Sequence, residues 1–493
     1  MIRTLIPAPV TSKLQPANRL GAIGGVTLTA RALLLLVAGV LGTVPGFFHL
    51  RWLPLMLAWD AVVLILAIAD LTMVSSGSDI SVTRAFLDSP VLGRDTRVEM
   101  QVLQTGSRLL RAHLADDLHP ALAQLPPAAD LTAYPRDPAR VVFTIAPTRR
   151  GDFALGGIWL RWRGPLGLVE RRAVARPEQK VRVYPTMERT AGDTQLYLLR
   201  IRQIELQRRR LRITGTGREF DHLREYRPGD EMRNISWSAT ARRARVITRE
   251  FTTERSQQVW IVLDAGRLSG TIFEMRRAAF AARPESSASS VTSFRDAAAD
   301  ETYLLSLNQL DQACGAGIAL AQTVMQAGDK AGLMVYGRGI QHQLLPATGP
   351  GALRLMIDAL ATARNESSEA DHLRAAARLG QLQRRRGLVL WITEMADSAR
   401  RPEVADAAVE LARRHLVLLV VLGHEEIHAT AARSPRNAAQ MFESAAAQEV
   451  LERRRQTLAG LRSKGVLVVE TTPGALSTDA INQYLEVKAR GLL

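Results

Sequence analysis

The chain has 493 residues and a formal net charge of +16, from 64 Lys and Arg against 48 Asp and Glu, with Cys314 as its one cysteine. This length exceeds what a single hydrophobic core fills, so two or three domains are expected. A lone cysteine excludes an internal disulfide and fits a reducing compartment. A basic balance suits nucleic acid, anionic lipid or an acidic protein. The sequence contains no helix-turn-helix, zinc finger or aromatic-interleaved RNA motif, so no nucleic acid is expected as a partner.

Two apolar runs near the N-terminus predict a membrane hairpin of two helices in residues 32–73. The runs, residues 32–50 and 53–73, each approach the roughly 20 apolar residues that a spanning helix needs. Residues 1–31 form a basic N-terminal arm, and no acidic residue occurs before Asp60. The positive-inside rule therefore places the arm in the cytoplasm, and two crossings return the C-terminal domains to the same side of the inner membrane.

Interruptions in both runs leave a re-entrant hairpin open as an alternative to two full spans. Pro45 and Gly46 break the first run, and Asp60 lies within the second. We expect Asp60 to lie near an interface or to pair with Arg51; the alternative is a functional intramembrane carboxylate. A cleaved signal peptide is not expected, because the first run starts late and lacks a small-residue cleavage site.

Residues 80–186 predict an all-β domain. Short, alternating segments such as ISVTRAF, TRVEMQVLQ, RVVFTIAP and KVRVYP are separated by turn residues, a pattern typical of antiparallel strands. Strands at this spacing favour a sandwich of immunoglobulin-like type. Residues 187–216 follow as a basic linker. Its arginine run, residues 208–210, is interpreted as a solvated face, with contact to anionic lipid as the alternative.

Residues 252–493 alternate strand-like and helix-like segments. The runs QQVWIVLDAG, AGLMVYG, GLVLWITEM, LVLLVVLG and VLVVETTP predict buried strands, and the amphipathic segments between them predict helices. This alternation indicates a parallel sheet covered on both faces. Ligands in such folds bind outside the carboxyl ends of the strands. The Ser- and Ala-rich residues 283–303 interrupt the pattern and predict a mobile insertion.

The densest group of charges is GREFDHLREYRPGDEMRNISWSATARRARVITREF, residues 217–251. RPGD predicts a turn, and we expect internal ion pairs such as Glu219 with Arg224 or Asp230 with Arg233. Exposed pairs contribute only about 0–1 kcal/mol, whereas bidentate Arg–carboxylate contacts also fix orientation. Two interpretations stay open: an intramolecular brace between domains, and a docking face for a partner.

The candidate site is therefore a partner-docking or domain-bracing surface. Its residues are Glu219, Asp221, Arg224, Glu225, Tyr226, Arg227, Gly229, Asp230, Arg233, Trp237 and Arg242. The sequence shows no serine or cysteine nucleophile arranged with His222, so no catalytic constellation is identified and the protein is not expected to be an enzyme. An enzymatic role for Asp221, His222 or Glu225 is the minor alternative.

Residues 217–251 resemble the defining segment of a bacterial family known as domain-of-unknown-function family 58. Supporting segments occur in the same order: APTRRGDFALG and GPLGLVERR precede it, and QAGDKAGLMVYG, LVLWITEMAD and INQYLEVKA follow it. The resemblance covers the chain from about residue 80. It implies an α/β fold with a von Willebrand factor type A-like domain. It also implies association with a MoxR-type AAA+ ATPase that assembles or activates other complexes.

The resemblance also raises a cation site, because type A domains often hold a divalent metal through D-x-S-x-S and residues on two further loops. Asp264 matches the first position, but Gly266 and Leu268 stand in place of the two serines. The degenerate candidates for metal ligands are Asp264, Thr393, Glu394 and Asp397. Two missing hydroxyls leave too few ligands for a tight Mg²⁺ site, so no cofactor is expected. Asp264 is expected to cap a loop or a helix start instead.

These observations favour a membrane-anchored, non-catalytic adaptor or scaffold that works with a MoxR-type AAA+ ATPase on a client protein complex. Two alternatives stay open. One is a metal-dependent protein-binding module of the type described above, known as a MIDAS, and the other is a membrane-associated hydrolase or transferase.

Overall fold

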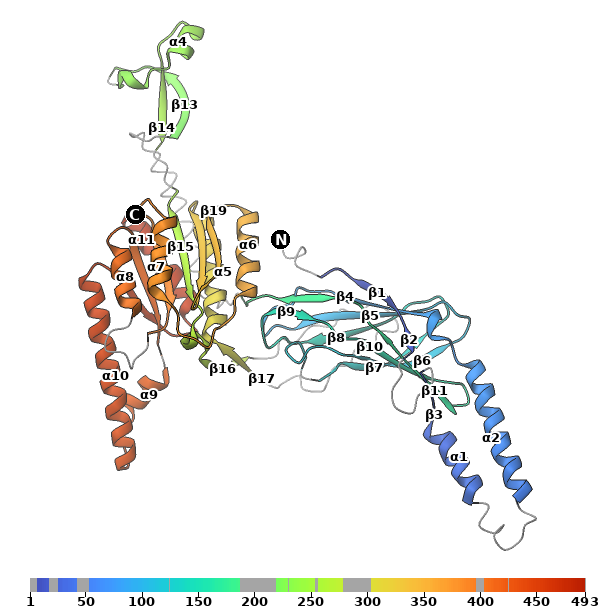
Figure 1. The fold of residues 1–493 in the computed structure, drawn as a ribbon. Coiled ribbons are helices and arrows are strands. Elements are labelled where there is room, and N and C mark those ends of the chain that lie inside the picture. The colour runs from blue at the N-terminus through green and yellow to red at the C-terminus, as the bar shows by residue number, and fades with distance from the viewer. Residues whose placement is uncertain are drawn as a thin grey trace. The chain divides into compact units, whose positions relative to one another are not determined.

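The chain is a mixed α/β protein with several sheets, one of them mostly parallel (Figure 1). A computed structural model describes residues 7–16, 25–41, 53–123, 125–186, 219–228, 230–252, 256–277, 303–395, 403–423 and 425–492. The basic linker, residues 187–216, lies outside them. The chain divides into two compact units. The first is Met1–Thr186 with Phe273–Leu307, and the second is Met187–Ile272 with Asn308–Leu493.

Two antiparallel sheets form most of the first unit. One sheet has the order β1 (Val10–Lys13), β4 (Ile80–Phe86), β5 (Thr96–Gln104) and β8 (Ala139–Ile145). The other has the order β2 (Gln15–Pro16), β11 (Val169–Ala175), β10 (Ile158–Arg163), β6 (Leu110–Asp116) and β7 (Ala128–Ala133). Strand β3 (Val26–Leu28) also pairs with β11. A separate small sheet is formed by β9 (Gly151–Ala154) and β12 (Lys180–Val183). Alternate residues of both large sheets share one core, for example Val82, Met100, Leu114 and Leu160, because successive side chains in a strand face opposite sides.

Residues before the first helix contribute strands to both sheets. β1 pairs with β4, and β2 and β3 both pair with β11, all antiparallel. This differs from the separate arm expected in residues 1–31. These strands are two to four residues long, and an edge strand needs only free backbone groups on its neighbour. So short a segment carries no detectable alternation.

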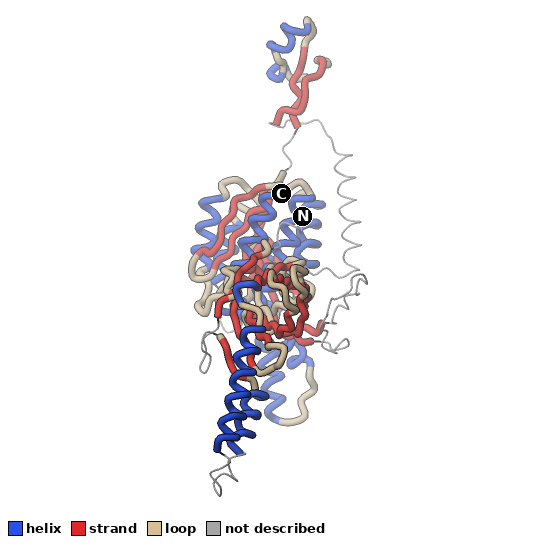
Figure 2. The backbone as a smooth tube through the Cα atoms, turned by 90° about the vertical axis from the view of Figure 1, so that its right-hand side faces the viewer, coloured by secondary structure: helices blue, strands red, loops and turns tan. Residues whose placement is uncertain are grey.

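Helices α1 (Ala30–Leu41) and α2 (Leu53–Met73) lie side by side and project from the first unit (Figures 1 and 2). Trp59 Nε1 donates to the carbonyl of Leu35 at 3.0 Å. Their apolar side chains face outward; Leu34 is 67% exposed and Ile65 is 64% exposed. Among the described residues, one apolar stretch, Leu57–Asp79, is long and apolar enough to cross a membrane, whereas Ala30–Leu41 is shorter.

Asp60 of α2 packs against α1 at a glycine. A Cβ built on Gly39 would lie 2.4 Å from Asp60 Oδ1, so the glycine permits this close approach of the two helices. Asp60 Oδ1 is buried and has no hydrogen-bond partner in the described part of the chain. Arg51, the partner expected for it, lies outside the described residues.

The start of α1 and the end of α2 are both hydrogen-bonded to the same loop of the first unit. Asp70, near the end of α2, is fully buried. Its carboxylate accepts from the backbone N–H groups of Leu166, Leu168 and Val169 at 2.9, 2.8 and 2.9 Å. Just before α1, Thr29 N–H donates to the carbonyl of Leu168 at 2.9 Å. The chain therefore leaves the sheets at α1 and returns to the same place after α2.

The second unit contains the parallel sheet that the sequence predicts. Its order is β19 (Ile340–Ala347), β18 (Lys330–Tyr336), β15 (Gln258–Asp264), β20 (Leu388–Thr393), β21 (Leu416–Leu422) and β22 (Leu467–Thr471). Neighbours are parallel except β19, which runs antiparallel to β18 at the edge.

Helices cover both faces of this sheet. One face packs on α5 (Gln309–Gln326), α6 (Pro350–Thr362) and α11 (Leu476–Ala489), and the other on α7 (His372–Leu382), α8 (Glu403–Ala412) and α10 (Ala438–Ser463), which contacts α9 (Glu425–Ala432). Trp260 and Ile261 of β15 point to opposite faces and are both fully buried. A strand that is buried on both sides needs continuous apolar sequence, which explains why these strands were recognisable.

Two short strands, β16 (Ile272–Arg277) and β17 (Tyr303–Asn308), pair with each other. They flank the expected insertion in residues 283–303, which apart from Tyr303 lies outside the described residues. After β17, Asn308 begins α5 with a capping box: its side chain accepts from Asp311 N–H, and the Asp311 carboxylate accepts from Asn308 N–H. This reciprocal pair satisfies two of the free donors at the helix start.

Candidate functional site

The parallel sheet changes its direction of winding between β15 and β20. Helix α5 leads from β15 to β18 on one side, whereas α8 leads from β20 to β21 on the other. In such sheets, ligands bind in the crevice outside the strand ends at this switch point. Asp264 ends β15 and Thr393 ends β20, so two of the predicted candidates lie at this place. Their side chains are in contact, with Thr393 Oγ1 donating to Asp264 Oδ2 at 2.7 Å.

Both carboxylate oxygens of Asp264 accept hydrogen bonds from the chain itself. Oδ2 accepts from Thr393, and Oδ1 accepts from the backbone N–H of Gly266 at 2.8 Å. The side chain is almost completely buried. Burial raises the pKa of Asp264 and outweighs the lowering by the nearby His372 and by these two hydrogen bonds. Asp264 thus has the loop-capping contact expected for it.

The loop that follows β15 has no room for the first serine of a type A metal site. A Cβ on Gly266 would lie 2.7 Å from the backbone nitrogen of Ala370, so a side chain there would force the backbone to move. Ser269 Oγ donates to the Gly266 carbonyl at 2.7 Å, and Asn365 Nδ2 donates to the same carbonyl at 2.6 Å. The loop is therefore filled and fixed by its own side chains.

The described residues at the switch point lack the ligand set of a type A cation site, because Gly266 stands in place of the first serine and Thr393 donates its hydroxyl to Asp264. Thr393 directs its hydroxyl to Asp264, and Glu394 is buried beside it. Asp397 lies outside the described residues. Within the described ranges, no group of three or more His, Cys, Asp or Glu side chains is placed to hold a metal ion. We assign no metal-dependent step to this site.

A row of three hydrogen-bonded side chains lies at the same edge of the sheet and was not predicted from the sequence. Trp391 Nε1 donates to the hydroxyl of Tyr336 at 2.8 Å, and that hydroxyl lies 2.8 Å from His372 Nδ1. The indole N–H donates to the Tyr336 oxygen, whereas the tautomer of His372 decides which group donates in the second contact. Burial, and then the Asp264 carboxylate, raise the pKa of Tyr336 well above its ordinary value, so the hydroxyl stays protonated. No spacing in the sequence relates these three residues.

The charged segment folds into an arm built on two strands. β13 (Glu219–Glu225) pairs antiparallel with β14 (Ile247–Thr252), and between them lie the turn η5 (Met232–Asn234) and α4 (Trp237–Arg243). Among the side chains of the arm that the structure describes, Ile235 and Ile247 are the buried apolar ones. Ser236 N–H donates to the Ile247 carbonyl at 2.8 Å, which joins the start of α4 to β14.

Arg224 and Asp230 form the bidentate pair of the arm. Arg224 Nη1 and Nη2 donate to Asp230 Oδ2 and Oδ1, both at 2.8 Å, and Arg227 N–H donates to Oδ2 at 2.8 Å. The hydrogen bonds from Arg224, and then that from Arg227, lower the pKa of Asp230 to about 2. The backbone of Asp230 donates to the Arg227 carbonyl at 3.0 Å, which confirms the turn predicted for RPGD.

Two further ion pairs lie in the described part of the arm, one between residues 20 positions apart and one between residues two positions apart. Arg245 pairs with Glu225 at 2.7 Å and Arg233 with Glu231 at 2.5 Å. Asp230 thus pairs with Arg224, and the expected pair with Arg233 was wrong, because the turn directs Asp230 back to β13. Trp237 is 69% exposed, and Tyr226 and Arg242 are also exposed. The side chains of Glu219 and Asp221, and all of Gly229, lie outside the described structure.

Fold and site together define a protein with an antiparallel two-sheet unit and a mostly parallel α/β unit that carries a charged arm. The C-terminal region of the chain matches the family model described as "Protein of unknown function DUF58" over residues 222–279 and 294–429. The match runs from β13 of the arm through β21, so the resemblance seen in residues 217–251 is confirmed for this region.

A curated relative and a solved structure are similar to parts of the chain. The "Uncharacterized protein YeaD" of Bacillus subtilis (strain 168) is 25% identical over 139 residues, which are 27% of this chain and 32% of that protein. The chain therefore spans about a third of the length of this relative. The crystal structure of the conserved hypothetical protein BatB from Bacteroides thetaiotaomicron covers 48% of this chain and 100% of its own, with 14% identity and a TM-score of 0.27.

Proposed function

We propose that this protein is a membrane-anchored, non-catalytic adaptor that presents its charged arm to a MoxR-type AAA+ ATPase acting on a client complex. The observation that carries this proposal is the helix pair. α1 and α2 expose apolar side chains such as Leu34 and Ile65. The start of α1 and the end of α2 are hydrogen-bonded to one loop of the first unit. Outward-facing apolar helices need a bilayer or a partner to cover them.

The same geometry supports a hairpin. A single span would place the residues before α1 and those after α2 on opposite sides of a bilayer. Here β1 pairs with β4, and β2 and β3 pair with β11, so strands from before α1 and after α2 share both large sheets and belong on one side. Residues 1–31 before α1 are basic, and by the positive-inside rule this charge supports the cytoplasm as that side.

The finer fold assignments are also proposals. We infer an immunoglobulin-like arrangement for the two antiparallel sheets, supported by their shared core. We infer a von Willebrand factor type A-like arrangement for the parallel sheet, supported by three helices on each face and the antiparallel edge strand β19. In this unit both carboxylate oxygens of Asp264 accept hydrogen bonds from within the chain, which favours a role in binding proteins through other surfaces.

The arm has the composition of a docking surface. Its exposed Trp237 lies among arginines, and tryptophan and arginine are enriched at the energetic centres of protein interfaces. The pairs of Arg245 with Glu225 and of Arg233 with Glu231 are exposed and so contribute little to stability. The bidentate, half-buried pair of Arg224 with Asp230 instead fixes the orientation of the turn that the arm presents.

Topology tests the anchor. We expect the full-length chain to stay in the membrane fraction after alkaline carbonate washing. Protease added to intact spheroplasts should leave it whole, and should cut it once the spheroplasts are lysed. Cleavage of the C-terminal unit in intact spheroplasts would contradict the assigned side.

Pull-down with the ATPase tests the arm. The full-length chain is expected to retain a MoxR-type ATPase from the same cell in at least one nucleotide state, and Trp237→Ala should weaken this retention. Phe442→Ala is the matched control, since Phe442 of α10 is 71% exposed and lies outside the arm. Absence of the ATPase in every nucleotide state, or equal loss with both variants, would rule out docking through the arm.

A further inference from the structure

An arginine-rich groove lies in the first unit, in a region that the sequence analysis did not single out. Its volume is about 1290 Å³. Six of its lining residues are arginines: Arg31, Arg108, Arg111, Arg140, Arg161 and Arg163. One carboxylate, Asp130, also lines it, and this carboxylate pairs with His113 at 2.8 Å. The groove is thus strongly basic.

Half of these arginines have carboxylate partners and half have none among the described residues. Arg163 and Arg161 lie 3.0 and 3.9 Å from Glu170, and Arg140 lies 3.9 Å from Glu99. The remaining three are Arg31, Arg108 and Arg111, and all are exposed. Guanidinium groups that lack an internal carboxylate attract an anion from outside, and their planar forks suit phosphate oxygens.

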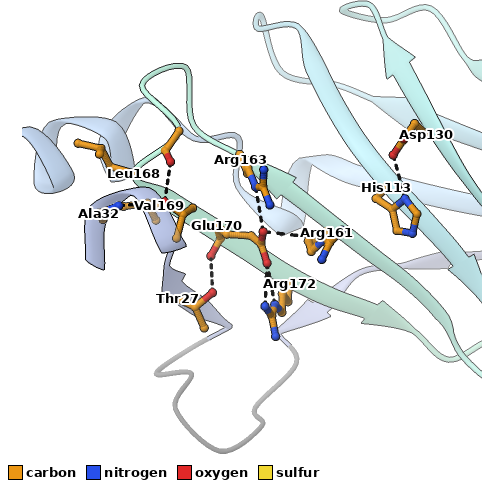
Figure 3. Close-up of polar contacts among 12 residues, drawn as sticks. Thr27, Ala32, His113, Asp130, Arg161, Arg163, Leu168, Val169, Glu170 and Arg172 are labelled. Carbon is orange, nitrogen blue, oxygen red and sulfur yellow. Dashed lines mark hydrogen bonds and ion pairs between the residues drawn. The ribbon is translucent and has the colours of Figure 1, made fainter. Parts of the chain in front are cut away.

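Glu170 pairs with two of the lining arginines, Arg161 and Arg163 (Figure 3). Its side chain is almost fully buried and accepts from Arg163 at 3.0 Å and from Arg172 at 2.9 Å. Burial raises the pKa of Glu170, but the hydrogen bonds from these two arginines outweigh it, and the pKa lies below its ordinary value. One ionised carboxylate therefore fixes several guanidinium groups without neutralising them all.

The groove lies where the two apolar helices meet the sheets. Arg31 belongs to the first turn of α1, and Met73, the last residue of α2, also lines the groove. Arg108 donates to the Thr72 carbonyl at 3.0 Å, at the end of α2. Tyr134, also in the lining, is 59% exposed. Exposed tyrosines and basic residues at the ends of an apolar helix are typical of the headgroup layer of a membrane.

We propose that this groove binds the phosphate headgroup of an anionic phospholipid. The inference rests on the proposed membrane anchoring, because the end of α2 brings the groove to headgroup level. The chemistry that is recognised is a phosphate group. We commit to the lipid as its source, because the acyl chains of a bound lipid would lie along the exposed apolar surface of α1 and α2. The lipid would fix the first unit against the bilayer surface.

Native mass spectrometry of the full-length chain in neutral detergent tests this proposal. The probes are phosphatidylglycerol, phosphatidylcholine and inorganic phosphate. We expect retention of phosphatidylglycerol in preference to phosphatidylcholine, and no displacement of it by inorganic phosphate at the same concentration. The double variant Arg31→Gln/Arg111→Gln should weaken retention roughly 25-fold, since each basic residue at an anionic surface contributes roughly fivefold.

The matched control is Arg433→Gln/Arg436→Gln, which removes two exposed arginines beyond the groove and should leave retention unchanged. Equal loss with both double variants, equal retention of the two lipids, or displacement by inorganic phosphate would each overturn the proposal. Carbonate extraction of the same variants separates this inference from the anchor. A chain that stays in the membrane but shows no lipid preference refutes the groove alone, whereas a chain that washes off refutes the anchor.

Discussion

The charged residues at the switch point of the second unit and those in the arginine groove of the first unit differ in burial and in hydrogen bonding. In the crevice, the carboxylate of Asp264 is buried and receives hydrogen bonds from Gly266 and Thr393. In the groove, Arg31 and Arg111 are exposed and have no carboxylate partner in the described structure. Asp264, at the strand ends where ligands of α/β sheets bind, is therefore hydrogen-bonded within the chain, whereas the arginines of the groove expose their charge.

The contrast distinguishes polar residues with a structural role from polar residues with a binding role. A buried group with every oxygen bonded stabilises the fold, and its removal exposes the cost of the unpaired partners. An exposed group without a partner contributes little to stability, so its presence indicates a role toward something outside the chain. Each substitution below is chosen to test on which side of this division a residue falls.

The largest effect is expected for Asp264→Ala. The substitution removes the acceptor of the Gly266 N–H and the nearer of the two acceptors of the Thr393 hydroxyl inside a buried loop. We expect a loss of about 3 kcal/mol in the free energy of unfolding, the usual cost of breaking a buried network. Urea denaturation followed by tryptophan fluorescence measures it, because Trp260 and Trp391 are buried in the same sheet.

Magnesium provides the control for this prediction. If the contacts of Asp264 are structural, 10 mM Mg²⁺ should leave the unfolding midpoint of the unaltered chain where it is. A midpoint that rises with Mg²⁺, together with loss of the rise in Asp264→Ala, would make the crevice a metal-dependent binding site after all.

A smaller effect on stability, with an opposite effect on binding, is expected for Glu170→Gln. The amide cannot accept as strongly from Arg163 and Arg172, and we expect a loss of about 1–3 kcal/mol in the free energy of unfolding. The same change adds one net positive charge to the groove wall, so retention of phosphatidylglycerol should increase. If stability and lipid retention both fall, Glu170 is required to hold the groove arginines in place, and this effect exceeds the gain from the added positive charge.

The pH dependence of the unaltered chain follows from the same carboxylate. Because the folded-state pKa of Glu170 lies below its ordinary value of 4.5, its contribution is fully present above pH 4.5. It is lost as the pH falls through the folded-state pKa. Glu170→Gln should therefore flatten this part of the curve of stability against pH.

The second unit shows how far sequence patterns reach. Strands such as β20 and β21 are continuous runs of Val, Leu, Ile and Trp, because both faces of the sheet are covered. The family resemblance pointed to Asp264 and Thr393 as residues of two neighbouring loops, and the structure places them at the carboxyl ends of adjacent strands. The contact between Tyr336 and His372 was not predictable, because it depends on how α7 packs over β18.

The first unit shows where such patterns fail. β6 has a small residue, Ala112, at a core position, and polar residues such as His113 and Arg171 stand between the core positions of β6 and β11, so their alternation of hydropathy is weak. The groove depends on these strands. The register of β10 against β6 places Arg161 opposite His113, and no local signal brings Arg31 to the same place. Long-range pairing, which composition does not encode, assembles this site.

A still smaller effect is expected in the arm on acidification. The pKa of Asp230 is lowered from its ordinary value of 3.8 to about 2 by Arg224. The ion pair therefore contributes fully above pH 3.8 and is lost as the pH falls toward 2. Hydrogen exchange of the Arg227 amide, which donates to Asp230, should accelerate relative to Ile247 across this window. Unchanged protection would show that backbone pairing alone holds the turn.

The smallest effect on stability is expected for Arg111→Gln, and it makes the sharpest contrast with Asp264. Arg111 is exposed on β6, so its removal breaks no internal ion pair in the described part of the chain. We expect the free energy of unfolding to change by less than about 0.5 kcal/mol, as for an ordinary surface position. Retention of phosphatidylglycerol should nevertheless fall roughly fivefold. A residue that stabilises nothing and still alters binding belongs to a binding surface. A loss of stability beyond 1 kcal/mol would instead give Arg111 a structural role and place the groove in the same class as the crevice.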